Sequence, residues 1–140
     1  MSLIRPTEGN SPGGTDGATC YVLGGGHVAA AIAGRLRTDD RPVSVVSESY
    51  EPSEPPGLRG DPTDARVLDA AGVAGASTVV VATRSDRRNL LIAQLVRTRF
   101  DVPRVVVLVN APERLEPLAE AGHEPVCATS ALADVLTERV

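Results

Sequence analysis

The sequence contains no lysine and no tryptophan, and its aromatic residues are two Tyr and one Phe. Without lysine the chain cannot use a Walker-type phosphate loop, a Schiff base or the Tyr and Lys pair of short-chain reductases. With so few aromatic residues, the core must consist mainly of Val, Leu, Ala and Ile. This composition favours a parallel β-sheet that is buried on both faces.

Long apolar runs are also absent. No run approaches the roughly 20 residues of a membrane-spanning helix, and no signal peptide is visible, so we expect a soluble, cytoplasmic protein. The net charge of -4 argues against a nucleic-acid partner, because phosphate binding needs a concentrated basic face. The 140 residues suffice for one domain, but not for a nucleotide-binding unit with a separate catalytic domain.

A glycine-rich turn follows the first apolar run. Residues 19–29 read Thr-Cys-Tyr-Val-Leu-Gly-Gly-Gly-His-Val-Ala, in which Gly24, Gly26 and Ala29 fit the dinucleotide-binding pattern G-x-G-x-x-[GA]. The small residues allow a tight bend, a close approach to a pyrophosphate, and packing of the next helix on the strand. The free N–H groups at the start of that helix then face the phosphates. The alternative interpretation is an ordinary structural turn or a decayed site.

The second expected strand ends where a Rossmann fold carries the acid that binds the ribose hydroxyls, about 20 residues after the glycines. Ser47 stands at that position, and Glu48 follows it. Neighbouring residues of a strand point to opposite faces, so Glu48 cannot be assumed to replace the missing acid. The identity of the ligand depends on these two residues.

Residues 1–18 lack apolar periodicity and are expected to be a flexible leader, whereas residues 19–140 form one domain. Thr63 is the expected N-cap of the second helix. The order of elements predicts an α/β fold, a doubly wound, Rossmann-like parallel sheet of about six strands with order 3-2-1-4-5-6 and helices on both faces. The expected strands lie near residues 19–23, 42–46, 57–59, 77–83, 103–110 and 125–128.

Only two cysteines and two histidines occur. Cys20 and Cys127 fall in strands about three spacings apart, or roughly 14 Å, which exceeds the roughly 7 Å that a disulfide tolerates. We therefore expect two buried structural thiols. The spacings of the cysteines and histidines do not form a metal-binding set.

Further motifs accompany the glycine turn. At these spacings they resemble the N-terminal nucleotide-binding domain of the regulators of potassium conductance, which is found in Trk-type potassium-uptake regulators. The resemblance extends from Thr19 to about Arg139 and implies a Rossmann-type regulatory domain. The motifs are Gly24 to Ala29, Gly60-Asp61-Pro62-Thr63-Asp64 with Val67-Leu68 and Ala71-Gly72-Val73, Ala82-Thr83 with Asp86 and Asn89-Leu90-Leu91, and Val109-Asn110 with Pro112.

The resemblance implies that the domain binds NAD(H) or an adenine nucleotide. The glycines, with backbone groups at His27 and Val28, would hold the phosphates. Asp61 would lie near the adenine, and Thr83 and Arg84 would line the crevice at the end of the fourth strand. The implied cofactor-binding residues are Gly24, Gly25, Gly26, His27, Val28, Ser47, Glu48, Asp61, Pro62, Thr83 and Arg84.

Three positions depart from the family pattern. The family commonly has an acid at Ser47 and an Arg at His27, and often an Arg at Leu108. Loss of the ribose acid leaves NADP, ATP or ADP, or no ligand at all, as alternatives to NAD(H). His27 either donates to a phosphate or is an exposed helix-start residue without such a task.

Three arginines and an asparagine follow the fourth strand. Arg84 is expected to neutralise phosphates at the carboxyl end of that strand, whereas Arg87 and Arg88 are expected to be solvated. Asn89 is expected to be a structural hydrogen-bonding residue.

The resemblance implies a regulator without catalysis, which forms dimers and rings below a membrane potassium transporter or channel and shifts transport when nucleotide binds. One alternative is a small NAD(P)-dependent oxidoreductase or a fragment of one, which needs a proton donor or acceptor beside the nicotinamide. Tyr21, Tyr50 and His123 are not expected to be suitably placed, which favours the sensor. Another alternative is a structural Rossmann domain that mediates assembly only.

Two helices carry more apolar residues than one sheet face needs, at residues 90–96 and 131–136. We therefore expect a homodimer or larger ring formed through the helices that flank the last strands.

Overall fold

The computed structural model describes residues 19–51 and 56–140, so the leader expected at residues 1–18 lies outside the described residues. The described chain forms a parallel sheet with the order β3-β2-β1-β4-β5-β6, which confirms the expected doubly wound α/β fold. The strands are β1 (Cys20–Leu23), β2 (Val43–Ser47), β3 (Gly57–Arg59), β4 (Thr78–Val81), β5 (Arg104–Val109) and β6 (Glu124–Cys127).

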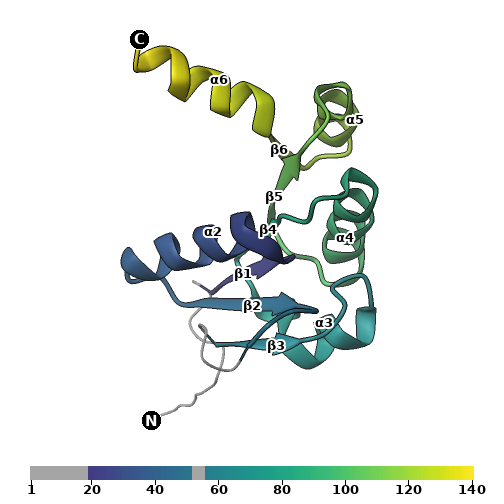
Figure 1. Cartoon of the computed structure of the whole chain (residues 1–140). Coiled ribbons are helices and arrows are strands. Elements are labelled where there is room, and N and C mark those ends of the chain that lie inside the picture. The colour runs from purple at the N-terminus through teal and green to yellow at the C-terminus, as the bar shows by residue number, and fades with distance from the viewer. Residues whose placement is uncertain (1–18, 52–55) are drawn as a thin grey trace.

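Helices cover both faces of the sheet (Figure 1). One face packs against α2 (Gly26–Thr38), and the other packs against α3 (Ala65–Ala71), α4 (Asp86–Arg99) and α5 (Leu115–Glu120). Two short 3-10 turns, η1 (Val73–Gly75) and η2 (Pro112–Arg114), precede β4 and α5. The last helix, α6 (Ala128–Glu138), follows β6 and extends away from the sheet (Figure 1).

The core has two parts, because side chains of a strand alternate between the two faces of the sheet. On the α2 face, Ala29 and Ala33 pack against Val22 and Val45. These small side chains allow α2 to lie close to the strands, so the start of α2 is fixed beside the end of β1. The larger part lies under α3, α4 and α5 and includes Leu23, Val46, Leu68, Val81, Ile92, Val96, Val107 and Leu118.

The N-cap of α3 differs from the sequence prediction. Asp64 is the cap, because its carboxylate accepts a hydrogen bond from the backbone N–H of Arg66 at 2.9 Å. Thr63 instead donates to Asp61 through its backbone N–H, at 2.9 Å, and through its hydroxyl, at 2.7 Å. Both Asp and Thr favour the N-cap position. The turn made by Asp61 and Thr63 decides between them, and the expectation for Thr63 is wrong.

The two cysteines are free and buried. Cys20 lies in β1 and Cys127 in β6, and β4 and β5 separate these strands. The expectation of two separate buried thiols is confirmed.

The two helices expected at an interface differ in burial. In α4, Ile92, Ala93 and Val96 are buried in the core, and only Leu91 is strongly exposed among its large apolar residues. The sheet face therefore uses most of the apolar surface of α4, and the expectation of a surplus on this helix is wrong.

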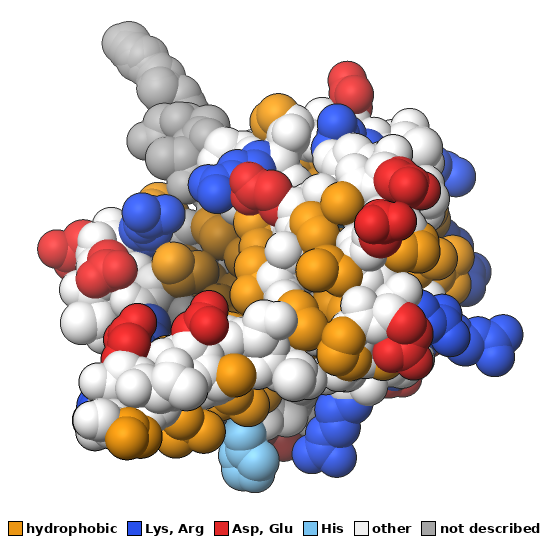
Figure 2. All heavy atoms as spheres, turned by 90° about the horizontal axis from the view of Figure 1, so that it is seen from above, with side chains coloured by type: hydrophobic (Ala, Val, Ile, Leu, Met, Phe, Trp, Pro, Cys, Tyr) orange, Lys and Arg blue, Asp and Glu red, His pale blue; other side chains and the backbone are white. Residues whose placement is uncertain are grey.

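The last helix does have such a surplus. No residue of α6 is buried, and Leu132, Val135 and Leu136 have relative exposures of 62%, 50% and 64%. Seen from above, hydrophobic side chains gather around a hollow in the surface (Figure 2). None of the helices described is both long enough and apolar enough to cross a membrane.

Asp86 links the first turn of α4 to the segment after β5. Its carboxylate accepts hydrogen bonds from the backbone N–H groups of Asn110 and Ala111, both at 2.8 Å, and from the side chain of Asn110 at 3.1 Å. Burial acts to raise the pKa of Asp86, but these hydrogen bonds outweigh it and hold the pKa below its ordinary value. The ionised carboxylate therefore fixes the segment that leads into η2.

We predict that Asp86→Asn lowers the free energy of unfolding at pH 7 by about 1–3 kcal/mol, because hydrogen bonds to a charged acceptor are lost. The pKa of Asp86 is lower in the folded protein than in the unfolded chain. Its contribution is therefore complete above the unfolded value, near 4, and disappears as the pH falls through the folded value. Urea denaturation at pH 7 and pH 3 should show the difference between variant and wild type shrinking with acid.

The matched control is Asp134→Asn on α6, whose side chain is exposed. It should change the free energy of unfolding by less than about 0.5 kcal/mol at either pH. An Asp86→Asn deficit that stays constant from pH 7 to pH 3 would contradict the role given to the ionised carboxylate.

Candidate nucleotide-binding site

The turn after β1 lies directly against β4. The φ angle of Gly24 is 145°, and a Cβ at this position would lie 2.5 Å from the carbonyl oxygen of Ala82. The backbone N–H of Gly24 also donates to the carbonyl of Val46 in β2 at 3.0 Å. A side chain on Gly24 would therefore force the turn away from β4. This glycine permits a close approach of two chain segments, as well as the bend that the sequence predicts.

The next two glycines begin α2. Gly26 has a φ angle of 82°, and the atoms nearest to a Cβ built there belong to the guanidinium of Arg84, at 3.8 and 3.9 Å. The N-cap residue Gly25 offers no side-chain acceptor, whereas Asp64 caps α3 and Ser85 caps α4. The first N–H groups of α2 therefore lack a side-chain cap at the positive end of the helix dipole. This arrangement suits a phosphate group.

A cavity of about 330 Å³ opens beside this turn, at the carboxyl edge of the sheet. Ligands bind to doubly wound sheets at this edge, where the strand order reverses. The cavity brings together all the residues implied by the family resemblance except His27, Val28 and Asp61. Its lining consists of Gly24, Gly25, Gly26, Ser47, Glu48, Ser49, Pro62, Thr83, Arg84 and Arg88.

A smaller cavity of about 180 Å³ adjoins the first one. Both are lined by Gly25, Thr83 and Arg84, so the crevice continues past the glycine turn towards β5. His27 and Val28 line this second cavity, and both are exposed. The remaining lining residues are Ala82, Leu108 and Asn110. A crevice on both sides of the turn matches the course of a dinucleotide across the switch point.

Ser47 and Glu48 differ in their surroundings. Ser47 is buried, and its hydroxyl lies 3.0 Å from the hydroxyl of Ser49 and accepts a hydrogen bond from the Ser49 N–H at 3.1 Å. A Cβ on Gly25 would lie 2.9 Å from the Ser47 oxygen, so this hydroxyl sits beside the glycine turn. Glu48 is exposed and also lines the cavity.

Asn89 holds the end of β4 in place. Its side-chain oxygen accepts hydrogen bonds from the N–H of Thr83 at 2.9 Å and from the Thr83 hydroxyl at 2.6 Å. Its amide donates to the carbonyls of Thr83, at 3.1 Å, and Leu108, at 2.9 Å. Asn89 is fully buried, so its structural role is confirmed. It fixes the backbone from which Thr83 reaches both cavities.

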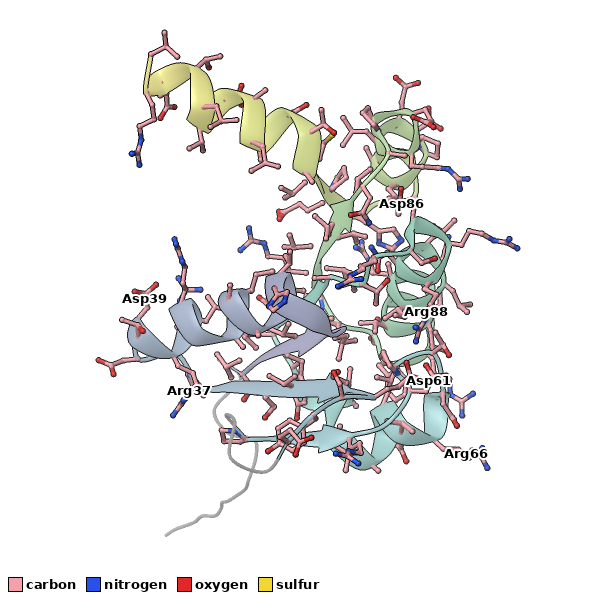
Figure 3. All side chains as sticks on the ribbon, in the orientation of Figure 1. Arg37, Asp39, Asp61, Arg66, Asp86 and Arg88 are labelled. Atoms are coloured by element: carbon pink, nitrogen blue, oxygen red, sulfur yellow. The ribbon has the colours of Figure 1, made fainter. Side chains whose placement is uncertain are left out.

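The structure pairs Arg88 with two carboxylates, so the expectation of a solvated Arg88 is wrong. Its Nη2 donates to Asp61 Oδ1 at 2.9 Å and to Glu48 Oε1 at 3.3 Å. Figure 3 shows Arg88 near the start of α4 with Asp61 close to it. Asp61 lies 27 residues away from Arg88 in the sequence, and Glu48 lies 40 residues away. No local pattern indicates such a pairing, whereas Arg87 is exposed as the sequence predicts.

The groups considered for proton transfer lie outside both cavities. Tyr21 donates its hydroxyl to the carbonyl of Ala71 in α3 at 2.6 Å. Tyr50 packs against the smaller core. His123 is buried in the turn before β6, and neither of its ring nitrogens has a hydrogen-bond partner within the described part of the chain. Burial, together with the charge of Arg97, lowers the pKa of His123.

Two curated relatives are similar over most of this chain. The Trk system potassium uptake protein TrkA homolog of Methanothermobacter thermautotrophicus is 27% identical over 112 residues, which are 75% of this chain and 51% of that protein. The Trk system potassium uptake protein TrkA of Haemophilus influenzae is 28% identical over 101 residues, which are 67% of this chain and 22% of that protein. The chain thus spans about half of the first relative and less of the second.

Three solved structures of GsuK are similar in fold, each at 25% sequence identity. The GsuK RCK domain has a TM-score of 0.78, and the match covers 87% of this chain and 28% of the GsuK chain. GsuK bound to ADP has a TM-score of 0.76, and the match covers 85% of this chain and 32% of the GsuK chain. The GsuK channel bound to NAD has a TM-score of 0.67, and the match covers 82% of this chain and 22% of the GsuK chain.

The family comparison agrees with the glycine turn, the strand order and the crevice. The model of the TrkA-N domain matches residues 20–129, which is well over half of the 140 residues. The chain therefore belongs to the TrkA-N domain family.

Proposed function

We propose that residues 19–140 form a non-catalytic regulatory domain, which binds NAD(H) or another adenine nucleotide and regulates a potassium transport system in the membrane. The observation that carries this proposal is the glycine turn, whose uncapped helix start opens into a cavity at the switch point of the sheet. The names of the similar proteins support a role in potassium uptake. We further propose a cytoplasmic location beside the membrane partner.

The crevice offers separate groups to the parts of a nucleotide. The amides at the start of α2 and the guanidinium of Arg84 would hold phosphates, and Ser47 and Glu48 lie towards the ribose. NAD(H) is the first candidate because the crevice extends past the turn, and ATP, ADP and NADP are alternatives. The missing acid at Ser47 removes a charged acceptor that contributes about 1.5–3 kcal/mol, so we expect weak binding unless Glu48 takes the ribose hydroxyls instead.

The sensor is favoured over an oxidoreductase by the positions of the proton-transfer groups. An oxidoreductase needs a donor or acceptor beside the nicotinamide. The hydroxyl of Tyr21 is bonded to a carbonyl of α3, and His123 lies in the turn after α5. Neither of them lines the crevice. Binding of a nucleotide needs no proton-transfer group, so the crevice suits a binding role.

The exposed face of α6 supports assembly into a homodimer or larger ring. Leu132 and Leu136 are four residues apart, so they lie on the same side of the helix, and both are more than 60% exposed. An apolar face of this kind on α6 fits a second copy of the chain, whose own α6 presents the same residues. The membrane partner would then respond to changes in subunit geometry.

We predict that NADH, NADPH, ATP or ADP raises the melting temperature of the protein, since ligand at 100 times its Kd adds about 2.7 kcal/mol of stability. Gly26→Val should abolish this shift, because its side chain would occupy the space between the turn and Arg84. Calorimetric titration, performed below the melting temperature of each variant, should detect no heat of binding for Gly26→Val.

The matched control is Gly75→Val in η1, where no atom lies within 4 Å of an added Cβ and which lines neither cavity. It should bind nucleotide as the wild type does. Equal titration curves for Gly26→Val and the wild type would place the phosphates elsewhere. The order of affinity among the four nucleotides decides between NAD(H) and its alternatives.

We also predict that Leu132→Asp combined with Leu136→Asp weakens self-association at least about 100-fold, because two apolar side chains no longer contribute roughly 1.5–3 kcal/mol each. Sedimentation velocity over a concentration series should show a dimer or larger species for the wild type and a monomer for the variant. Leu91→Asp on α4 alters a leucine of 53% exposure and should leave the assembly intact. A wild type that stays monomeric at the highest concentration contradicts the assembly proposal.

A further inference from the structure

Arg88 joins three chain segments at the carboxyl edge of the sheet. It belongs to the first turn of α4, Glu48 follows β2, and Asp61 follows β3. One nitrogen, Nη2, donates to both carboxylates, at 3.3 Å to Glu48 and at 2.9 Å to Asp61. The side chain of Arg88 is 39% exposed, and it lines the same cavity as Glu48. The guanidinium thus spans the side of the crevice where β2 and β3 end.

The Asp61 end of this arrangement is held by several hydrogen bonds. The same Oδ1 that accepts from Arg88 also accepts from the backbone N–H and the hydroxyl of Thr63. The hydrogen bonds from Thr63, with a further effect of Arg88, hold the pKa of Asp61 below its ordinary value, so the carboxylate stays ionised at neutral pH. The backbone N–H of Arg88 donates to the hydroxyl of Ser85 at 3.2 Å, which fixes the other end. Arg88 is therefore held at both ends.

The carboxylate of Glu48 can accept further hydrogen bonds. Arg88 donates to its Oε1, and an ionised carboxylate offers about four acceptor positions. Ser47, by contrast, uses its hydroxyl within the turn, since it bonds the hydroxyl and the N–H of Ser49. At the end of β2 in this cavity, the carboxylate available to a ligand is that of Glu48.

We propose that Glu48, positioned by Arg88 and through it by Asp61, accepts the ribose hydroxyls of the bound nucleotide in place of the missing acid at position 47. This inference rests on the proposed function, because it requires an adenine nucleotide in the crevice. Two neighbouring hydroxyls can donate to one carboxylate, and such charge-assisted bonds are the strong ones. Glu48 is then a specificity-determining residue for ribose, and Arg88 is a positioning residue.

The test compares ADP with 2′-deoxy-ADP, because their ratio of Kd values isolates the ribose hydroxyl from the phosphates. For the wild-type protein, calorimetric titration should give a Kd for 2′-deoxy-ADP that is roughly 10- to 100-fold higher than that for ADP. In Glu48→Gln the ratio should fall to about twofold, since a neutral amide accepts a weaker bond. Arg88→Gln should also lower the ratio, because Glu48 loses the partner that holds it over the cavity.

Arg84→Gln is the matched control, because the guanidinium of Arg84 lies beside Gly26, whereas Arg88 is the arginine that bonds Glu48. It should weaken ADP and 2′-deoxy-ADP by the same factor and leave the ratio unchanged. Both Glu48→Gln and Arg88→Gln alter exposed or half-exposed pairs, so their melting temperatures without ligand should stay close to that of the wild type.

The outcomes separate this inference from the proposed function. If the wild type binds ADP but Glu48→Gln keeps the wild-type ratio, Glu48 is not the ribose acceptor, while the proposed function stands. A wild type that binds ADP and 2′-deoxy-ADP equally overturns the inference in the same way. If the wild type binds no ADP, ATP or NADH at all, both the inference and the proposed function fail.

Discussion

The crevice depends on how closely the first turn approaches the fourth strand. Gly24 has no side chain, so its backbone can rest on the peptide between Ala82 and Thr83 while its N–H bonds the carbonyl of Val46. The ends of three neighbouring strands are thereby drawn together around one turn. The contact sets the start of α2 beside the segment that leads into α4, since the Arg84 guanidinium lies 3.8 Å from the position of a Cβ on Gly26. A methyl group on Gly24 would force the turn away from the end of β4.

Much of the fold follows from local sequence patterns, and less of the site does. The Val-rich runs predict the strands and their order, and the spacing of Gly24, Gly26 and Ala29 predicts the turn, because these features depend on residues close in sequence. The sequence predicts Thr63 as the N-cap of α3, but the bonds from Thr63 to Asp61 leave that position to Asp64. The pairing of Arg88 and the burial of most of α4 could not be predicted. Both arise from segments that meet only in the folded chain.

Two polar residues of α4 connect the crevice with the last third of the domain. Asn89 holds Thr83 and bonds the carbonyl of Leu108 in β5, and Asp86 holds the backbone at Asn110 and Ala111. Both residues lie in the first two turns of the helix, next to the end that also carries Arg88. These hydrogen bonds therefore connect the start of α4 with the end of β5 and with the segment that leads into η2. The apolar contacts deeper in α4 keep the rest of the helix on the sheet.

The geometry of α6 has a mechanical consequence. This helix is joined to the domain at β6, a strand of four residues at the edge of the sheet, and none of its 11 residues is buried. A helix of that length extends about 16 Å from its base, so a tilt of about 10° at β6 displaces its far end by about 3 Å. The sheet itself need hardly change for that displacement to occur. A tilt of that size would displace the exposed apolar side chains of α6 without disturbing either part of the core, because neither part includes a residue of α6.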